Sequence, residues 1–436
     1  MTPPLSHYFA SKNPPPTRMA QMECAKRTDA VTAINVSVGN VSLPMHPAMQ
    51  ERMLHLADHN TFHNGIVQYT QTVGTKEAND AFLNIIASSG CKTQWLYSQI
   101  TDGWSQAMEL VILGVSDAHD RPILLIDPAY ANYLNFAART SRDIVTITRT
   151  LQSDGLFSLP AISEIEDVIK QYNPSAIIVI PYDNPTGQLF TRAMMIDLAR
   201  LCVAHNMRFI SDEAYRELSY TDSDVISIWW IDNTIVPGIE SRRMSLETTS
   251  KVWNACGLRI GALVTDNQEF HTKAVIENAN SLCANTIGQY ILGALAHVSH
   301  ADLQSRYRQQ RSYYGAILPK IAAEIREAIP WAIVSRADAS IYLVVDVRAI
   351  VQPWWDTVAF SLFCAREWKV DIDGVAHTLL VAPMAGFYSV PKAFGITEKN
   401  PWQTQMRIAC VETPERMALI PMLLKELLGQ FEGKIV

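Results

Sequence analysis

Four residues that could do chemistry stand just after short apolar runs, where expected β-strands end. Asn184 opens the sequence Asn-Pro-Thr-Gly, Asp212 is followed three residues later by Tyr215, and Lys251 lies among hydroxyl residues. In parallel α/β sheets, ligands bind outside the carboxyl ends of the strands. We therefore predict that these side chains meet at one site and act there on a small molecule.

Each of these residues also has a plainer interpretation. Asn-Pro and Thr-Gly are turn dipeptides, so Asn184 could simply reverse the chain. Asp212 could cap the following helix. Lys251, taken alone, fits an exposed loop, which is where most lysines lie. A carboxylate at the end of a buried strand nevertheless costs free energy without a cation or donors, so we expect Asp212 to have a partner.

A strand-to-helix turn at Gly103 suggests an anion site. Free backbone N–H groups and the helix dipole at such a turn suit a phosphate. The sequence from Gly103 through Ser105 also nearly matches the Gly-x-Ser-x-Gly turn of hydrolases, but Ala107 replaces the last glycine. Asp and His residues in a matching order do not stand out, so a hydrolase is disfavoured.

The elements that must position these residues form an α/β pattern. From about residue 95 to 265, short runs rich in β-branched residues alternate with segments of helical period such as Thr191–His205, which predicts a parallel sheet covered by helices. The candidate strands are Ser98–Thr101, Pro122–Asp127, Ile144–Thr148, Ala176–Pro181, Arg208–Ser211, Met244–Thr248 and Gly261–Thr265.

A second, smaller α/β unit is expected after about residue 300. A long helix at Ala301–Ala328, a strand at Ile341–Val347 and a closing helix from Pro414 indicate it. The proline-rich N-terminal arm is expected to dock on the rest or to reach a partner subunit. The predicted division is 1–50 for the arm and part of the small domain, 51–305 for the large domain and 306–436 for the C-terminal small domain.

Composition narrows the class of protein. The 436 residues are 48% hydrophobic and 18% charged, as in globular proteins, and the net charge of −7 gives no attraction to nucleic acid or anionic lipid. The seven cysteines are scattered and never form Cys-x-x-Cys, so we expect neither disulfides nor a metal site. Signal-peptide and membrane-spanning patterns are not recognised, which favours a cytoplasmic protein.

Together, the motifs resemble the class I and II aminotransferases, which are fold-type I pyridoxal-phosphate enzymes. The resemblance spans about residues 35 to 415. It implies a mainly parallel central sheet in a large cofactor-binding domain, plus a smaller α/β domain. The residues that carry it are Val38-Gly39-Asn40, Tyr69–Gly74, Gly103, Asp127–Tyr130, Asn184–Gly187, Asp212–Tyr215, Ser250-Lys251, Gly257–Gly261 and Arg407-Ile408.

The resemblance assigns roles at the pyridoxal ring. Lys251 would form the Schiff base with the cofactor and then move the proton between the substrate α-carbon and cofactor C4′. Asp212 would pair with the pyridine nitrogen, so that an asparagine there should cripple turnover. Asn184 and Tyr215 would donate to the phenolate oxygen, and Tyr130 would stack on the ring.

The remaining implied roles concern the cofactor phosphate. Backbone and side-chain donors of Gly103, Trp104 and Ser105 would grip it, with a hydroxyl from Thr248 and a charge from Arg259. At two of these positions the chain departs from the family: a serine is frequent at 248, and the tryptophan at 104 is bulky.

The substrate and the second subunit are implied in the same way. Arg407 would bind the substrate α-carboxylate in a two-pronged pair, near Gly39 and Asn184. Tyr69 would reach the phosphate of the neighbouring subunit, which implies a homodimer with shared active sites.

The implied reaction exchanges an amino group between an amino acid and a 2-oxo acid through pyridoxamine phosphate. A C–S β-lyase, an aminocyclopropane-carboxylate-synthase-like enzyme or a decarboxylase on the same fold stays open. A non-catalytic regulator would need a basic DNA-binding domain ahead of the fold, and only about 30 residues precede Ile34.

The substrate stays undefined at this stage. A second arginine cannot be assigned to a distal carboxylate, which weakly favours an aromatic or other neutral amino acid. The candidates for an aromatic pocket, if they are not core residues, are Tyr8, Phe9, Phe62, Trp104, Trp253 and Phe387.

Overall fold

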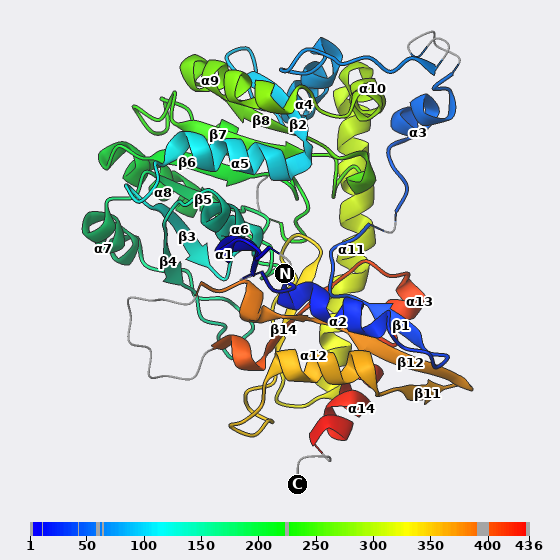
Figure 1. The fold of residues 1–436 in the computed structure, drawn as a ribbon. Helices are drawn as coiled ribbons and strands as arrows, with labels where there is room; N and C mark the ends of the chain where they lie inside the picture. Colours follow the sequence, from blue (N-terminus) through cyan, green and yellow to red (C-terminus); the bar gives the residue numbers. More distant parts are fainter. Residues whose placement is uncertain are drawn as a thin grey trace.

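The fold is described from a computed structural model of the chain. It covers residues 3–10, 12–41, 43–57, 62, 65–222, 226–389 and 401–432. Two bodies of secondary structure are joined by the long helix α11 (His300–Ala328), as Figure 1 shows. Among the described residues, no helix is both long and apolar enough to span a membrane.

The larger body contains a seven-stranded sheet. Only β8 runs against the other strands, since it pairs antiparallel with both of its neighbours. The strand order is β2 (Tyr97–Asp102), β8 (Ile260–Thr265), β7 (Arg243–Thr248), β6 (Arg208–Asp212), β5 (Ala176–Val179), β3 (Ile123–Asp127) and β4 (Ile144–Thr148). Five of these strands are wholly or almost wholly buried, which explains their continuous apolar runs.

Helices cover this sheet. α5 (Gly103–Val115) packs on β2, β7 and β8, and α8 (Arg192–Ala204) packs on β6. The other helices of this body are α3 (Pro47–Leu54), α4 (Lys76–Ser88), α6 (Asn132–Arg139), α7 (Ile162–Tyr172), α9 (Gln268–Asn278) and α10 (Thr286–Gly293). Side-chain oxygens of Thr75, Thr191 and Asn267 cap α4, α8 and α9, so the sequence itself sets these helix starts.

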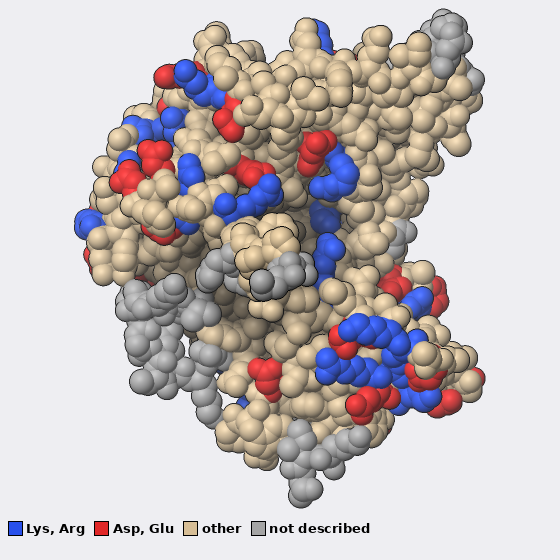
Figure 2. All heavy atoms as spheres, viewed as in Figure 1, with Lys and Arg blue, Asp and Glu red and all other residues tan. Residues whose placement is uncertain are grey.

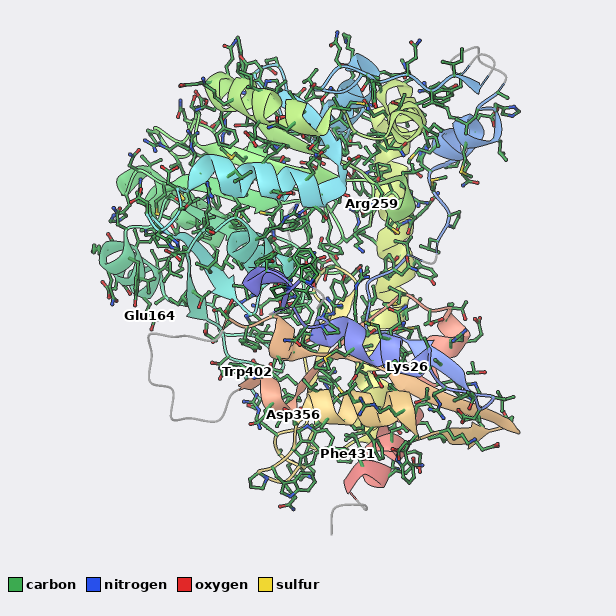
Figure 3. The ribbon with its side chains drawn as sticks, viewed as in Figure 1. Lys26, Glu164, Arg259, Asp356, Trp402 and Phe431 are labelled. Atoms are coloured by element: carbon green, nitrogen blue, oxygen red, sulfur yellow. The ribbon has the colours of Figure 1, made fainter. Side chains whose placement is uncertain are left out.

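The smaller body holds two short sheets. One has the order β1 (Thr32–Asn35), β12 (Val375–Leu380), β11 (Val370–Ile372). The other has the order β13 (Ala382–Pro383), β14 (Gln405–Ala409), β10 (Tyr342–Asp346), β9 (Ile333–Val334). Its helices are α2 (Pro16–Cys24), α12 (Thr357–Arg366), α13 (Pro414–Met417) and α14 (Ile420–Glu432), and the one-turn helix α1 (His7–Ala10) precedes α2 in the arm. Lys26, Asp356, Trp402 and Phe431 mark this body in Figure 3.

The N-terminal arm docks on the smaller body of its own chain. α2 packs against α12, and Arg366 Nε lies 2.9 Å from a carboxylate oxygen of Glu23. β1 pairs in parallel with β12, so residues near the start of the chain complete a sheet made by residues near 375. Of the two outcomes expected for the arm, docking is the one observed.

The mainly parallel α/β fold predicted from the sequence is confirmed. All seven strands expected between residues 95 and 265 are present, with ends that differ by at most two residues. The expectation of a single strand after residue 300 was too simple, because β9 and β11 to β14 also form. These strands are two to six residues long, too short for several of them to show a periodic pattern in the sequence.

Candidate active site

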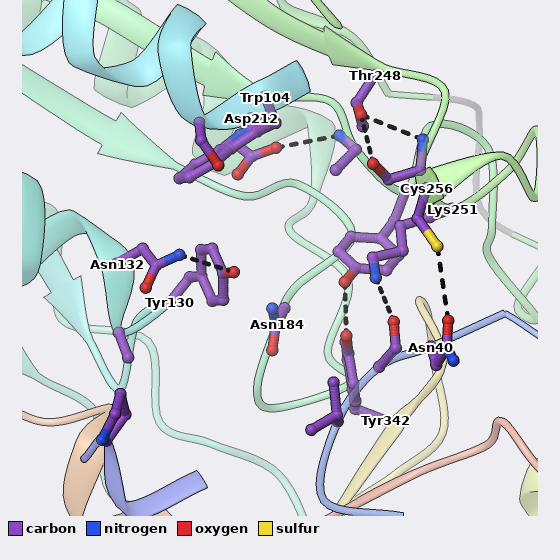
Figure 4. A pocket seen from close by; sticks show the side chains of 18 of the residues that line it. Asn40, Trp104, Tyr130, Asn132, Asn184, Asp212, Thr248, Lys251, Cys256 and Tyr342 are labelled. Carbon is purple, nitrogen blue, oxygen red and sulfur yellow. Dashed lines mark hydrogen bonds between the residues drawn. The ribbon is translucent and has the colours of Figure 1, made fainter. Parts of the chain in front are cut away.

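A cavity of about 610 Å³ opens at the carboxyl ends of the parallel strands, between the two bodies. Figure 4 shows this cavity from close by. Eleven of the thirteen site residues proposed from the sequence line it: Gly39, Trp104, Ser105, Tyr130, Asn184, Asp212, Tyr215, Thr248, Lys251, Arg259 and Arg407. The other two, Gly103 and Tyr69, are not among its lining residues.

Lys251 follows β7 and extends into the cavity. Its ammonium group donates a hydrogen bond to the backbone carbonyl of Gly39, which comes from the smaller body. Gly39 must be a glycine, because a Cβ there would lie 2.1 Å from the hydroxyl oxygen of Tyr342. The lysine nitrogen therefore reaches the opposite wall, where a backbone oxygen is its one hydrogen-bond partner among the described residues.

Asp212 ends β6 and is buried without a cation. One carboxylate oxygen accepts from the hydroxyl of Tyr133 at 2.7 Å, and the other accepts from the backbone N–H of Ala214 at 3.1 Å. Burial raises the pKa of Asp212 to about 7, although these two hydrogen bonds oppose the shift. Asp212 has no ion pair among the described residues, so a cationic group from outside the chain would stabilise its ionised form.

The partners of Arg407 lie on the smaller body and on the turn after β5. Its Nη1 donates to the side-chain oxygen of Asn184 and its Nη2 to the carbonyl of Ser37, both at 2.8 Å. Its guanidinium carbon lies 4.3 Å from the centre of the Tyr342 ring. The Nε of Arg407 is buried and has no acceptor among the described residues. A carboxylate in the cavity would satisfy it.

Tyr215 and Tyr342 form a buried hydroxyl pair beside this arginine. Their hydroxyl oxygens are 2.6 Å apart, and burial raises the pKa of Tyr215 well above its usual value. Tyr215 is therefore a neutral hydroxyl at physiological pH. Asn184 turns its amide nitrogen toward the middle of the cavity, because Arg407 occupies the amide oxygen (Figure 4).

The start of α5 and Arg259 make an anion-binding end of the cavity. Gly103 has φ of +69°, and a Cβ there would lie 2.5 Å from Arg259 Nη2. α5 has no side-chain hydrogen bond at its N-cap. Because β8 runs antiparallel, residue 259 at its start lies where β7 ends, as the Thr248–Gly261 pairing shows. In Figure 3, Arg259 lies beside the end of α5.

Hydroxyl groups and a close backbone approach complete this end. Thr248 Oγ1 lies 2.9 Å from Ser250 Oγ, and both residues line the cavity. A Cβ on Gly261 would lie 2.6 Å from the backbone nitrogen of Trp104, so only glycine lets β8 approach the turn this closely. The backbone donors at residues 103 to 105 are thus held beside a guanidinium.

Aromatic rings form the wall next to Asp212. Trp104 and Tyr130 meet edge to face, with ring centres 5.2 Å apart, and the amide nitrogen of Asn132 lies 3.1 Å from the Tyr130 hydroxyl. Burial raises the pKa of Tyr130 to about 12, while the charges of Arg407 and Arg18 oppose the rise. The tryptophan that departs from the family thus serves as an apolar wall.

Several lining residues were not predicted from the sequence: Pro15, Arg18, Ser37, Asn132, Asn135, Ser250, Cys256 and Tyr342 among them. Tyr342 lay inside a predicted strand, but its position beside Tyr215 depends on how the two bodies pack. Arg18 lay in the arm, for which no fold was assigned. Patterns within one sequence do not reveal either neighbour.

The suggested aromatic pocket is largely wrong. Only Trp104 and Phe387 line the cavity. Trp253 is core, 3% exposed and 5.7 Å from the ring of Tyr307, while Phe9 is 66% exposed. Tyr8 is also exposed, and Phe62 packs on Tyr290. The cavity is instead lined mainly by polar and basic side chains.

The remaining proposed residue, Tyr69, is 78% exposed. Its side chain is therefore accessible to another molecule. The described residues contain no cluster of His, Cys, Asp and Glu that could hold a metal ion, and all seven cysteines are free thiols.

The donors in the cavity fit pyridoxal phosphate. An uncapped helix start with Arg259 suits its phosphate, an unpaired buried carboxylate suits a protonated ring nitrogen, and a lysine suits its aldehyde. The fit rests on the isolation of Asp212 and on the cradle at Gly103, both of which are properties of this chain.

The family of the chain follows from its similarity to known proteins. Residues 31–374 match the model described as aminotransferase class I and II. An aspartate aminotransferase of Thermotoga maritima is 23% identical over 297 residues, 67% of this chain and 74% of the relative.

Two solved structures show the same fold. N-succinyldiaminopimelate aminotransferase of Mycobacterium tuberculosis has a TM-score of 0.77 at 18% identity, covering 98% of this chain and 100% of the other. Kynurenine aminotransferase of Pyrococcus horikoshii also has a TM-score of 0.77 at 18% identity, covering 98% and 97%. With the family model matched over most of its length, the chain belongs to the class I and II aminotransferases, enzymes that transfer amino groups.

Proposed function

We propose that the protein uses pyridoxal phosphate to move an amino group between an amino acid and a 2-oxo acid. The observation that carries the proposal is the isolation of Asp212, a buried carboxylate without a cation, in the same cavity as Lys251. Such a carboxylate is costly unless a ligand supplies the positive charge. A protonated pyridine ring supplies it.

Each of the cavity residues would have a separate role in the reaction. When bound, pyridoxal phosphate accepts the electron pair that is left when the substrate α-carbon loses its proton. Lys251 would carry that proton, because an amine can lose its proton, whereas the arginines that line the cavity cannot. Asp212 would keep the ring nitrogen protonated, and Arg407 would fix the α-carboxylate of the amino acid. Arg259 and the start of α5 would hold the phosphate.

A β-lyase, an aminocyclopropane-carboxylate-synthase-like reaction or a decarboxylase would need the same cofactor residues. Transamination is favoured because the family model that matches the chain is that of aminotransferases. The substrate does not transfer from the relatives, since their names specify aspartate, N-succinyldiaminopimelate and kynurenine.

We also propose a homodimer with shared active sites. Tyr69 supports it, because a tyrosine that is 78% exposed on one chain is free to complete the phosphate site of a second. Sedimentation velocity should give a species of twice the chain mass, and Tyr69→Phe should weaken the binding of added pyridoxal phosphate. A monomer that binds the cofactor at full strength would contradict this.

A cytoplasmic location fits the seven free thiols.

The test of function combines an amino-acid panel with one lysine variant. Purified protein loaded with pyridoxal phosphate is mixed with single amino acids, and the cofactor absorbance and the released products are followed. Transamination releases the matching 2-oxo acid, whereas release of ammonia and pyruvate indicates a lyase, and release of carbon dioxide a decarboxylase. Either of the last two results would replace the proposed reaction.

Lys251→Ala should lower turnover by at least about 1,000-fold, because it removes both the attachment point and the proton carrier. Borohydride reduction should leave the cofactor on the peptide that contains Lys251 and nowhere else. Lys273→Ala, on the exposed side of α9, is the matched control and should behave as the unchanged protein. If Lys251→Ala turned over normally, the assignment would be wrong.

A further inference from the structure

We propose that Arg18 binds a carboxylate on the side chain of the substrate, so that the enzyme prefers amino acids with a second acidic group. Arg18 lies in the first turn of α2 and lines the same cavity as Lys251 and Arg407. The proposal rests on the proposed function and names its substrate class.

The guanidinium of Arg18 is not bound to the rest of the described chain. Among the residues that the structure describes, the side chain of Arg18 forms no hydrogen bond and no ion pair. Most other arginines near the arm are used: Arg27 pairs with Asp29 at 2.7 Å, and Arg366 pairs with Glu23 at 2.9 Å. Arg18 is thus a cation that faces the cavity without an assigned structural partner.

The charged side chains that line the cavity are mostly basic. Four basic side chains line it, namely Arg18, Lys251, Arg259 and Arg407, against one acidic side chain, Asp212. Figure 2 shows a row of Lys and Arg side chains down the middle of this face of the molecule.

Three of the four positive charges have a counterpart in the proposed reaction. The phosphate would pair with Arg259, the α-carboxylate would pair with Arg407, and Lys251 would hold the cofactor. The negative charge of Asp212 is matched by the ring nitrogen. Arg18 is the one basic side chain of the lining to which this scheme assigns no group, and a carboxylate on the substrate side chain could pair with it.

The position of Arg18 is set by the fold. α2 is fastened to α12 by the Glu23–Arg366 pair, and the nearby Arg27 donates to the carbonyls of Cys364 and Trp368 at 3.3 and 3.1 Å. Asn132 and Asn135 of α6 line the cavity as well, so the surroundings are polar. Amide and guanidinium donors together suit a carboxylate better than an apolar side chain.

The inference reverses the preference for neutral amino acids that the sequence alone suggested. That preference followed from the lack of an assignable second arginine. The arm supplies one, because it docks over the cavity of its own chain. The aromatic residues thought to form an apolar pocket mostly lie elsewhere.

The test compares acids with their amides in Arg18→Gln. For glutamate and aspartate, the variant should raise KM by about 10- to 100-fold, because it removes a charge-assisted hydrogen bond. For glutamine and asparagine, which differ only in charge, KM should change less than about threefold, and kcat should hold for all four. Arg18→Lys should restore part of the loss. Arg200→Gln, which removes an exposed arginine on α8, is the control.

A second measurement does not need turnover. Succinate and butanoate differ by one carboxylate, and their binding to the loaded protein can be followed by calorimetry. Succinate should bind more tightly, and Arg18→Gln should remove most of the difference. The proposal fails if Arg18→Gln affects acids and amides equally, or if butanoate binds as well as succinate. Lack of reaction with every amino acid would instead refute the proposed function, and the succinate comparison would still decide the role of Arg18.

Discussion

Two neighbouring residues, Asp212 and Glu213, end up in opposite electrical surroundings. Asp212 faces the cavity and has no cation. Glu213 belongs to a buried cluster of charges, the Arg216 cluster, formed by Glu213, Arg216 and Glu247. Arg216 Nη2 lies 2.6 Å from a Glu247 oxygen and 3.6 Å from a Glu213 oxygen. Hydroxyls of Ser227 and Ser245 complete this cluster.

The surroundings of Asp212 and Glu213 distinguish charges that stabilise the fold from charges that can bind a ligand. In the Arg216 cluster, each charge lies within 3.6 Å of an opposite charge supplied by the chain, although Glu213 Oε2 and Arg216 Nε have no hydrogen-bond partner among the described residues. In the cavity, the basic side chains outnumber the acidic one; among the described residues, Asp212 has no cation, and Arg18 and the Nε of Arg407 have no hydrogen-bond partner. Breaking the cluster should therefore cost stability, while changing the cavity should cost binding.

The largest effect on stability is expected from Arg216→Leu. It would leave two buried carboxylates facing each other, and burial already raises the pKa of Glu247. The free energy of unfolding should fall by about 3 to 5 kcal/mol, measured by urea denaturation of the cofactor-free protein. Arg200→Gln on the surface should change it by less than about 0.5 kcal/mol.

The double variant Arg216→Leu with Glu247→Gln sharpens the comparison. It removes one of the two uncompensated charges, so part of the lost stability should return. A small loss in Arg216→Leu alone would mean that the cluster is not held by its charges.

A smaller and different effect is expected from Arg259→Gln. Its guanidinium is exposed and bonds only the carbonyl of Cys256 at 3.0 Å, so unfolding of the cofactor-free protein should hardly change. Pyridoxal phosphate titrated into the protein should bind about 10- to 100-fold more weakly, since a charged donor to the phosphate is lost. Equal losses of stability and cofactor affinity would place Arg259 with the structural charges.

Much of this fold could be predicted because the central strands are local features. β5 and β3 are continuous apolar runs that end at turn residues, and such runs can be recognised as buried strands from the sequence alone. β13 has two residues and forms by pairing with β14, more than twenty residues further along the chain. Pairing over such separations leaves no periodic signal in the sequence.

The site residues likewise fall into those that could be predicted from the sequence and those that could not. Asn184, Asp212 and Lys251 follow strands of one sheet, so their convergence followed from the topology. Arg18 and Tyr342 belong to the other body and reach the cavity through packing between the two bodies. Predicting them would have required the docking of the arm and the smaller sheets, which depends on tertiary contacts.

The smallest expected effect concerns Asp212 and pH. Its pKa of about 7 in the folded protein exceeds the value of about 3.9 for an unfolded chain. The folded state thus binds more protons between about pH 4 and 7. The free energy of unfolding of the cofactor-free protein should fall as the pH rises through this window, and the cost is complete above pH 7.

Asp212→Asn cannot ionise, so it should remove that cost while crippling turnover. Without cofactor, the variant should be about 1 to 2 kcal/mol more stable than the unchanged protein at pH 8, and this difference should shrink steadily toward pH 4, by urea denaturation. Asp127, whose pKa burial raises to about 6, is present in both proteins and cancels in the difference. Pyridoxal phosphate should stabilise the unchanged protein more than the variant at pH 8, because only Asp212 gains an ion pair. A difference in stability that stays constant from pH 5 to 8 would show that Asp212 is a structural residue like Glu213.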